Sequence, residues 1–315
     1  MSAPKPVRHV GICGIGQMGA AASVSFKRAG YSVLLWARNA SKLAAVEPNL
    51  IEIETWMDEH MGSPPRDGGS LQCVTQLDSL DEQADLVMDC IAEELDQKVD
   101  LFSRMPRSIE RGAIFITTTS GLSITEMGRR SGTEHLLAGT HFWNPPHLMP
   151  LVEVIRGERT PAEIVDRVCD VIESIGKIPV RVNRDVPGFI GNRLLHAMWR
   201  EAIHLVQEGI ATPEDIDLVA RLTFGLRMPA VGPLENMDLV GLDLIHKIHQ
   251  YLLADLADDH EPLAALSELV SRGDLGMDHD QGFYDWRNRD ANELVERRDL
   301  QIVRQLEFLR ERVGL

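Results

Sequence analysis

The sequence of 315 residues lacks the features that mark several classes of protein. It contains no run of about 18 consecutive apolar residues, so we expect no transmembrane helix. Its first residues form no apolar signal core with a small-residue cleavage site, so we expect a cytoplasmic protein. The few cysteines form neither a CxxC pair nor a zinc pattern, so we expect reduced thiols and no metal site. They are Cys13, Cys73, Cys90 and Cys169.

Basic residues are also scarce. Lys and Arg total 32 against 48 for Asp and Glu, which gives a formal net charge of −16 at pH 7. Nucleic acids and anionic membranes are bound by clustered basic charge, so we expect neither as a partner. A composition of 44% hydrophobic and 25% charged residues is ordinary for a soluble globular protein. The length allows two domains of roughly 100–200 residues each.

The first part of the chain alternates short apolar runs with helical or loop segments. Strands that alternate with helices pair in parallel, which predicts a doubly wound α/β sheet. The segment Glu47–Gly69 interrupts this pattern with an acidic helix and the turn SPPRDGG, which we interpret as an excursion from the sheet. The expected strands are His9–Cys13, Tyr31–Trp36, Leu86–Ile91, Ala113–Thr117, Leu137–His141, Leu151–Ile155 and Pro179–Val182.

The second part is helical. It follows the tract NRDVPGF at Asn183–Phe189, which we interpret as a hinge, and its apolar residues recur at helical spacing. We therefore predict an α/β domain of the dinucleotide-binding type over residues 1–185 and an all-α domain over residues 186–315. The expected helices are Asn192–Glu208, Pro213–Thr223, Asp238–Leu256, Pro262–Val270 and Asp290–Arg312.

A glycine-rich turn follows the first strand and precedes a helix expected at Ala20–Ala29. In a GxGxxG turn the first glycine permits the tight bend, the second lets a pyrophosphate approach the backbone, and the third lets the helix pack closely on the strand. In this strand–turn–helix context the motif predicts a Rossmann dinucleotide-binding domain, and the alternative is a turn without a ligand. Its residues are Gly14, Ile15, Gly16, Gln17, Met18 and Gly19.

The residues after the second strand bear on the choice of dinucleotide. NAD sites place an Asp or Glu there for the ribose 2′-hydroxyl, whereas NADP sites accommodate an Arg for the 2′-phosphate. Here Ala37 and Arg38 follow Trp36, and the first carboxylate is Glu47. The guanidinium of Arg38 offers a fork of donors to a phosphate. We therefore favour NADP(H), with NAD(H) as the alternative, in which Arg38 is solvated or stacks on the adenine.

A histidine and a glutamate lie in neighbouring apolar runs. His141 follows Leu136–Thr140, and Glu153 lies inside Leu151–Ile155, where a carboxylate needs a partner to be buried. The turn at Asn144-Pro145-Pro146 would fold the two runs side by side. A glutamate that fixes the tautomer of an imidazole creates a general base for a hydroxyl proton. The alternative is a satisfied core pair without a chemical role.

Two further polar residues are candidates for the same site. Ser120 closes the run TTTSG at the end of an expected strand, where sheets of this kind meet their ligands. Its hydroxyl would bridge a substrate oxygen and the histidine, and the alternative is a cap for a helix at Ile124–Arg130. Asn192, in PGFIGNR, opens the first long helix of the second part.

These segments together resemble the L-3-hydroxyacyl-CoA dehydrogenase family, through GIGQMG, TTTSGLSI, HFWNPPHLMPLVEVI, DVPGFIGNRLL, VGPLENMDLVGLD and GFYDW. The resemblance implies that His141 is the general base in oxidation and that Glu153 orients it. It implies that Ser120 and Asn192 hold the substrate oxygen and the catalytic geometry. In AEELDQK it places Glu93 and Lys98 near the nicotinamide ribose, although by itself Glu93 is interpreted as a solvated helix start. It also implies a homodimer through the second domain.

The sequence departs from the family at three places. Thr118–Gly121 (TTSG) stands where the family usually has Asn-Thr-Ser-Ser, and Ala37 stands where it has an acidic residue. The family's lysine-rich excursion, which meets coenzyme A, corresponds to Asn39–Gln72, where the basic residues are Lys42 and Arg66. The acidic residues of this segment are Glu47, Glu52, Glu54, Asp58, Glu59 and Asp67.

An acidic excursion is a poor host for a phosphorylated ADP group. The wording NPPHLMPLVEV is similar to the branch that oxidises free hydroxy compounds, which includes carnitine, gulonate and pyridine-alcohol dehydrogenases. We therefore expect an oxidoreductase that transfers a hydride between a nicotinamide cofactor and the C3 hydroxyl or keto carbon of a small hydroxy acid or related alcohol. The alternatives are an acyl-CoA thioester substrate and a nucleotide-binding protein without catalysis.

Overall fold

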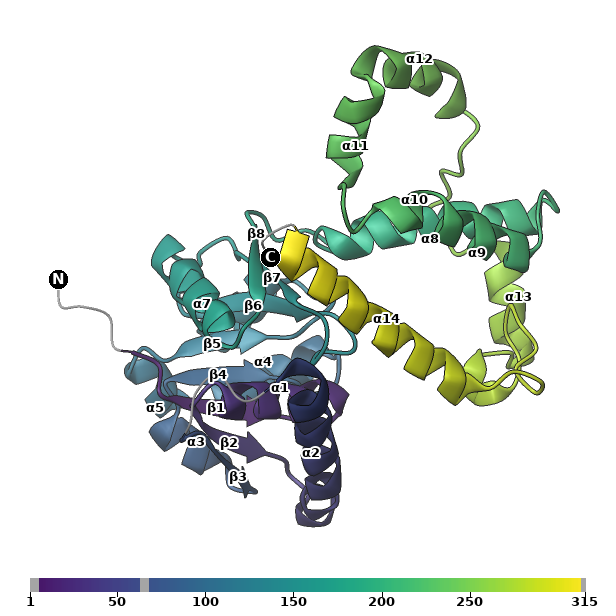
Figure 1. Ribbon diagram of the computed structural model, residues 1–315. Coiled ribbons are helices and arrows are strands. Elements are labelled where there is room, and N and C mark those ends of the chain that lie inside the picture. Colours follow the sequence, from purple (N-terminus) through teal and green to yellow (C-terminus); the bar gives the residue numbers. More distant parts are fainter. Residues whose placement is uncertain (1–5, 63–67, 313–315) are drawn as a thin grey trace. The chain divides into compact units, whose positions relative to one another are not determined.

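The computed structural model describes residues 6–62 and 68–312 of the chain. They divide into two compact units, one that ends at Arg193 and one that begins at Leu194 (Figure 1). The domain boundary that we place between residues 185 and 186 stays a prediction. Five residues of the turn SPPRDGG, 63–67, lie outside the described residues, and Arg66 and Asp67 are among them.

Among the described residues, the first unit contains one sheet of eight strands in the order β3-β2-β1-β4-β5-β6-β7-β8 (Figure 1). Every neighbouring pair is parallel except β6 and β7, which are antiparallel. This is the predicted Rossmann doubly wound sheet. The strands are β1 His9–Cys13, β2 Ser32–Trp36, β3 Ser70–Val74, β4 Leu86–Asp89, β5 Ile114–Thr117, β6 Leu137–Phe142, β7 Leu151–Ile155 and β8 Ile178–Val182.

Helices cover both faces of this sheet, which explains why its central strands are continuous apolar runs. Within β2, Val33 and Leu35 belong to a core that includes residues of α1, α2 and α7. Leu34 and Trp36 point into a second core with α3, α4 and α6. The helices of the unit are α1 Gln17–Arg28, α2 Ala40–Met61, α3 Leu77–Gln83, α4 Leu95–Ser103, α5 Pro106–Glu110, α6 Ile124–Ser131 and α7 Ala162–Ser174.

The acidic excursion is the helix α2, followed by a strand that the sequence analysis missed. β3 reads SLQCV and pairs in parallel with β2 at the edge of the sheet. Its side chains are exposed or half-buried, so it lacks the apolar run by which the buried strands are recognised. Two of the acidic side chains of α2 hold it to α1, because Glu54 pairs with Lys27 at 2.8 Å and Asp58 pairs with Arg28.

The second unit is helical, as predicted. One expected helix, Asp238–Leu256, is wrong as a single element, since Gly241 at φ +105° separates α11 from α12. None of the helices among the described residues is long and apolar enough to cross a membrane. The helices are α8 Gly191–Gln207, which starts in the first unit, α9 Pro213–Leu222, α10 Phe224–Arg227, α11 Pro233–Val240, α12 Leu242–Leu252, α13 Ala264–Arg272, the 3₁₀ turn η1 Met277–His279 and α14 Ala291–Arg312.

Candidate active site

The centre of the site is the antiparallel pair β6–β7. In its register His141 lies directly opposite Glu153, so the two side chains share one face of the sheet. Nδ1 of His141 lies 2.6 Å from Oε2 of Glu153, and both residues are buried. The turn at Asn144-Pro145-Pro146 therefore brings the two runs together as predicted. A carboxylate only accepts hydrogen bonds, so Nδ1 carries the proton and Nε2 of the neutral imidazole keeps a lone pair.

The second oxygen of Glu153 is also satisfied. Oε1 accepts hydrogen bonds from the backbone amides of Ile190 at 2.9 Å and Gly191 at 3.0 Å, where α8 begins. Burial raises the pKa of Glu153, but the hydrogen bonds from His141, Gly191 and Ile190 lower it, and the net result is a pKa below the usual value of a glutamate. Glu153 is therefore ionised at neutral pH and fully hydrogen-bonded.

Aromatic rings surround His141. The ring centroid of Trp143 lies 5.0 Å from that of His141, and the centroid of Phe189 lies 5.7 Å from it. Trp143 is half-buried and Phe189 is fully buried. Sequence reasoning did not single out Phe189, because one phenylalanine in a loop tract gives no periodic signal.

Ser120 and Asn192 lie together, as expected. The side-chain amide of Asn192 donates to the backbone oxygen of Ser120 at 3.0 Å. Ser120 is exposed, and it is not the cap of α6, because the hydroxyl of Ser123 accepts from the amide of Glu126. The hydroxyl of Ser120 is thus free of the capping role that was its alternative.

Glu93 and Lys98 belong to a charged network that contacts the backbone amide of Ser120. Oε1 of Glu93 accepts from the hydroxyl of Thr119 at 2.5 Å and from the amide of Ser120 at 2.8 Å, and its Oε2 lies 3.5 Å from Nζ of Lys98. The ammonium of Lys98 is buried and pairs with Asp89 at 2.7 Å. Sequence reasoning missed Asp89, although a carboxylate at the end of the apolar strand LVMD is a signal for it.

The glycine-rich turn has the shape that a pyrophosphate requires. Gly14 has φ +119°, and a Cβ at Gly19 would lie 2.0 Å from the backbone oxygen of Gly14, so both positions exclude other residues. A Cβ at Gly16 would meet nothing within 4 Å, which leaves space above the turn. Gln17 begins α1 and is exposed, and the first amides of a helix are donors for anions. Ile15 and Met18 pack against the core of the first unit.

The predicted residues share one edge of the sheet. Gly14 follows β1, Arg38 follows β2, Glu93 follows β4 and Ser120 follows β5. The carboxyl ends of parallel strands meet at the same edge, and His141 lies near that end of β6. This is where ligands bind in open α/β sheets. Arg38 is exposed beside the buried Ala37, so its guanidinium is available at the end of β2.

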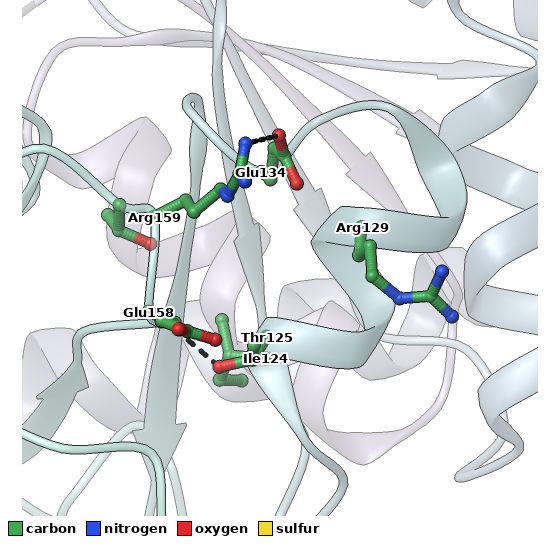
Figure 2. Close-up of a pocket in the computed structure, with 8 residues that line it drawn as sticks. Ile124, Thr125, Arg129, Glu134, Glu158 and Arg159 are labelled. Atoms are coloured by element: carbon green, nitrogen blue, oxygen red, sulfur yellow. Dashed lines mark hydrogen bonds and ion pairs between the residues drawn. The ribbon is translucent and has the colours of Figure 1, made fainter.

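A small cleft, with about 40 Å³ of space for water-sized molecules, lies at the opposite end of β6. Figure 2 shows the ion pair of Arg159 with Glu134 in this cleft, and the hydrogen bond that the backbone amide of Glu158 donates to the hydroxyl of Thr125. The hydroxyl of Thr160, which lines this cleft, donates to the backbone oxygen of Leu137 at the start of β6. The cleft is therefore separate from the His141 site. Within residues 6–62 and 68–312, no group of three His, Cys, Asp or Glu side chains is placed to hold a metal ion.

Two family models match the chain. The NAD binding domain of 3-hydroxyacyl-CoA dehydrogenase matches residues 9–186, and the C-terminal domain of the same enzyme matches residues 188–286. The chain is 31% identical to 5-formyl-3-hydroxy-2-methylpyridine 4-carboxylate 5-dehydrogenase of Mesorhizobium japonicum over 88% of this chain and 90% of the relative. It is 36% identical to L-carnitine dehydrogenase of Nocardiopsis dassonvillei over 76% of this chain and 72% of the relative.

The comparison with solved structures agrees with the family models. A crystal structure of 5-formyl-3-hydroxy-2-methylpyridine 4-carboxylic acid 5-dehydrogenase, described as an NAD⁺-dependent dismutase, matches with a TM-score of 0.91 and 30% identity over 96% of this chain and 98% of that chain. The structure of (S)-3-hydroxybutyryl-CoA dehydrogenase from Ralstonia eutropha matches with a TM-score of 0.73 and 27% identity over 90% and 100%. Because the two family models together match most of the sequence, the chain belongs to the 3-hydroxyacyl-CoA dehydrogenase family and is a nicotinamide-dependent dehydrogenase that acts on CH–OH groups.

Proposed function

We propose that this dehydrogenase interconverts the hydroxyl and keto forms at C3 of a small hydroxy acid or related alcohol, with His141 and Glu153 as the acid–base pair. One observation carries the proposal. The buried 2.6 Å hydrogen bond between these two residues lies at the sheet edge that also carries the GxGxxG turn. A general base beside a dinucleotide site is the arrangement that alcohol oxidation requires.

In oxidation, Nε2 of His141 removes the proton of the substrate hydroxyl, since Nδ1 is engaged by Glu153. The carboxylate of Glu153 then stabilises the imidazolium that forms. In the reverse direction the protonated His141 returns this proton to the substrate oxygen. The hydroxyl of Ser120 and the amide of Asn192 hold the substrate oxygen beside Nε2. The nicotinamide ring, when bound, accepts or donates the hydride.

The cofactor would be held by two groups of residues. The turn from Gly14 to Gly19, with the open space above Gly16 and the free amides of α1, suits the pyrophosphate. Glu93 and Lys98, which face each other at 3.5 Å beside Ser120, would hold the nicotinamide ribose.

The substrate that we propose carries no coenzyme A. The exposed face of α2 presents Glu47, Glu52 and Glu59, which repel a phosphorylated ADP group. The end of this helix packs against the loop after β6, because the ring of Trp56 meets the ring of His147 edge-on, with 5.3 Å between the centroids. Within the helix, Trp56 also stacks on His60. The higher TM-score with the pyridine-carboxylate dehydrogenase, compared with the acyl-CoA enzyme, also supports a free substrate.

For the dinucleotide we propose a preference for NADP(H). The proposal is supported by Ala37, which presents no carboxylate to the ribose, and by the exposed Arg38, whose guanidinium would bind a 2′-phosphate. The pyridine-carboxylate dehydrogenase of known structure is described as NAD⁺-dependent and therefore does not support this preference. The preference for NADP(H) rests on the residues at the end of β2 of this chain.

We also propose a homodimer through the second unit. Leu263 is the one buried hydrophobic residue among the described residues of this unit. Large apolar side chains remain exposed on several helices, and burial of such surface against a second copy is strongly favourable. They include Leu194, Met198, Trp199, Leu226, Leu234, Leu239 and Tyr251.

The substrate class is tested by turnover of the purified protein, with NADP⁺ and NAD⁺ in parallel for oxidation and with NADPH and NADH in parallel for reduction. We expect oxidation of free hydroxy compounds such as L-carnitine, L-gulonate and pyridine alcohols, and little reduction of acetoacetyl-CoA. Rapid reduction of acetoacetyl-CoA would identify a true acyl-CoA enzyme instead.

His141→Asn should lower kcat by about 100- to 10,000-fold, because the proton acceptor is lost. The Kd of the cofactor should stay unchanged. His135→Asn, an exposed histidine before β6, is the matched control.

Glu153→Gln tests the buried carboxylate through its pH dependence. The pKa of Glu153 is lowered on folding, so its contribution to stability is present above about pH 4.5 and is lost as the pH falls through the lowered value. The unfolding free energy of the native protein should therefore exceed that of the variant most at neutral pH, and the difference should shrink below about pH 4.5. Thermal or urea unfolding from neutral to acidic pH measures this difference. A difference that is constant with pH would contradict the assignment.

Arg38→Asp tests the choice of dinucleotide. The new carboxylate repels a 2′-phosphate and accepts from a 2′-hydroxyl, so the Kd of NADPH should rise by about 10-fold or more while that of NADH falls. Fluorescence titration measures both constants. Arg104→Asp, at the exposed end of α4, makes the same charge change elsewhere and should leave the ratio unchanged. Tighter binding of NADH than of NADPH by the native protein would overturn the preference.

The homodimer is tested by light scattering during size-exclusion chromatography. We expect a particle of two chains of 35.1 kDa each. The double variant Leu234→Lys with Leu239→Lys should weaken this dimer, because both side chains are about three-quarters exposed in the single chain, at 74% and 76%. A native protein that elutes as a monomer at micromolar concentration would refute the proposal.

A further inference from the structure

The backbone of Phe189 is in an unusual conformation. Its φ is +50°, in the left-handed region that glycine, asparagine and aspartate tolerate and that bulky residues rarely adopt. Among the described residues, Asp280 is the other non-glycine residue with positive φ. Phe189 is also fully buried, with 1% of its surface exposed. Strained conformations of this kind persist where the surrounding structure requires them, and they cluster at functional sites.

The turn at Phe189 directs two amides at Glu153. Its own amide donates to Val186 at 3.1 Å, which closes the turn. The next two amides, of Ile190 and Gly191, donate to Oε1 of Glu153 at 2.9 Å and 3.0 Å. Both amides reach the same oxygen because two consecutive left-handed residues, Gly188 at φ +76° and Phe189, reverse the chain immediately before α8 begins.

The ring of Phe189 contacts the other partner of the pair. It packs on the imidazole of His141, with ring planes inclined by 56°. Trp143 packs on the same imidazole and also against α8, where a Cβ at Gly191 would lie only 2.2 Å from Cζ2 of Trp143. The imidazole is therefore confined by two aromatic rings and one carboxylate.

We propose that Phe189 is a positioning residue of the acid–base pair. Its left-handed backbone aims two amides at Glu153, and its ring holds the imidazole of His141 against that carboxylate and away from water. This inference rests on the proposed function of the pair. It assigns separate tasks to the backbone and to the ring of one residue, and the two tasks respond to different substitutions.

The backbone task is tested without any substrate. Glycine accepts the left-handed conformation and a β-branched residue resists it, so Phe189→Gly should retain the two hydrogen bonds and Phe189→Val should lose them. Hydrogen exchange of the Ile190 and Gly191 amides measures this. We expect exchange about 10-fold faster or more in Phe189→Val only, with the amide of Val154 in β7 as the internal reference. Equal protection in both variants would overturn this part. If Phe189→Val does not fold, Phe189→Ile, which is also β-branched and closer to phenylalanine in volume, replaces it.

The ring task is tested by steady-state kinetics. Phe189→Ala should lower kcat by about 10- to 100-fold, since a small displacement of a catalytic group has effects of this size. The KM and the cofactor Kd should change less than about twofold, and Phe189→Leu should restore most of kcat by refilling the space. Phe102→Ala removes an equally buried ring in α4 and should leave kcat of the folded enzyme unchanged.

The outcomes separate this inference from the proposed function. A kcat that is unchanged in Phe189→Ala would overturn the ring task, and so would an equal loss in Phe102→Ala. If the native protein turns over no hydroxy or keto compound with either nicotinamide cofactor, the proposed function fails. In that event the exchange experiment still decides whether Phe189 aims the two amides at Glu153.

Discussion

The candidate site depends on one constraint, the burial of an ionised carboxylate inside a sheet. An uncompensated charge at Glu153 would be strongly destabilising, because burial removes its hydration. Here each oxygen has partners, the imidazole on one side and two amides on the other. The register of β6 and β7, the turn before α8 and the tautomer of His141 together meet this requirement. The same contacts fix the orientation of the imidazole that we propose as the acid–base group.

The parallel sheet brings the remaining parts to the same place. Each βα unit ends its strand at one edge, so residues far apart in the sequence meet there without individual contacts that select them. The antiparallel pairing of β7 with β6 brings the glutamate back to this edge from the next strand. Asn192 and Glu93 then connect to the same loop through the backbone of Ser120. The buried ammonium of Lys98, which faces Glu93, is paired with the buried carboxylate of Asp89, as buried charges require.

The charge of α2 is the basis on which we propose a substrate without coenzyme A. The exposed side of α2 is acidic, and two of its other carboxylates serve to attach the helix to α1. Function resides in the residues placed on the fold and not in the fold itself.

The sequence by itself determined the βαβ order, the GxGxxG turn and the pairing of His141 with Glu153, because each depends on local periodicity, on glycine geometry or on a short turn. It did not reveal β3, whose edge position requires no apolar run, or the break of the helix at Gly241. The amides that hold Glu153, the ring of Phe189 and the ion pair of Asp89 with Lys98 were decided by the tertiary structure alone. They join segments distant in the chain, and no local pattern records which buried charge a distant backbone will satisfy.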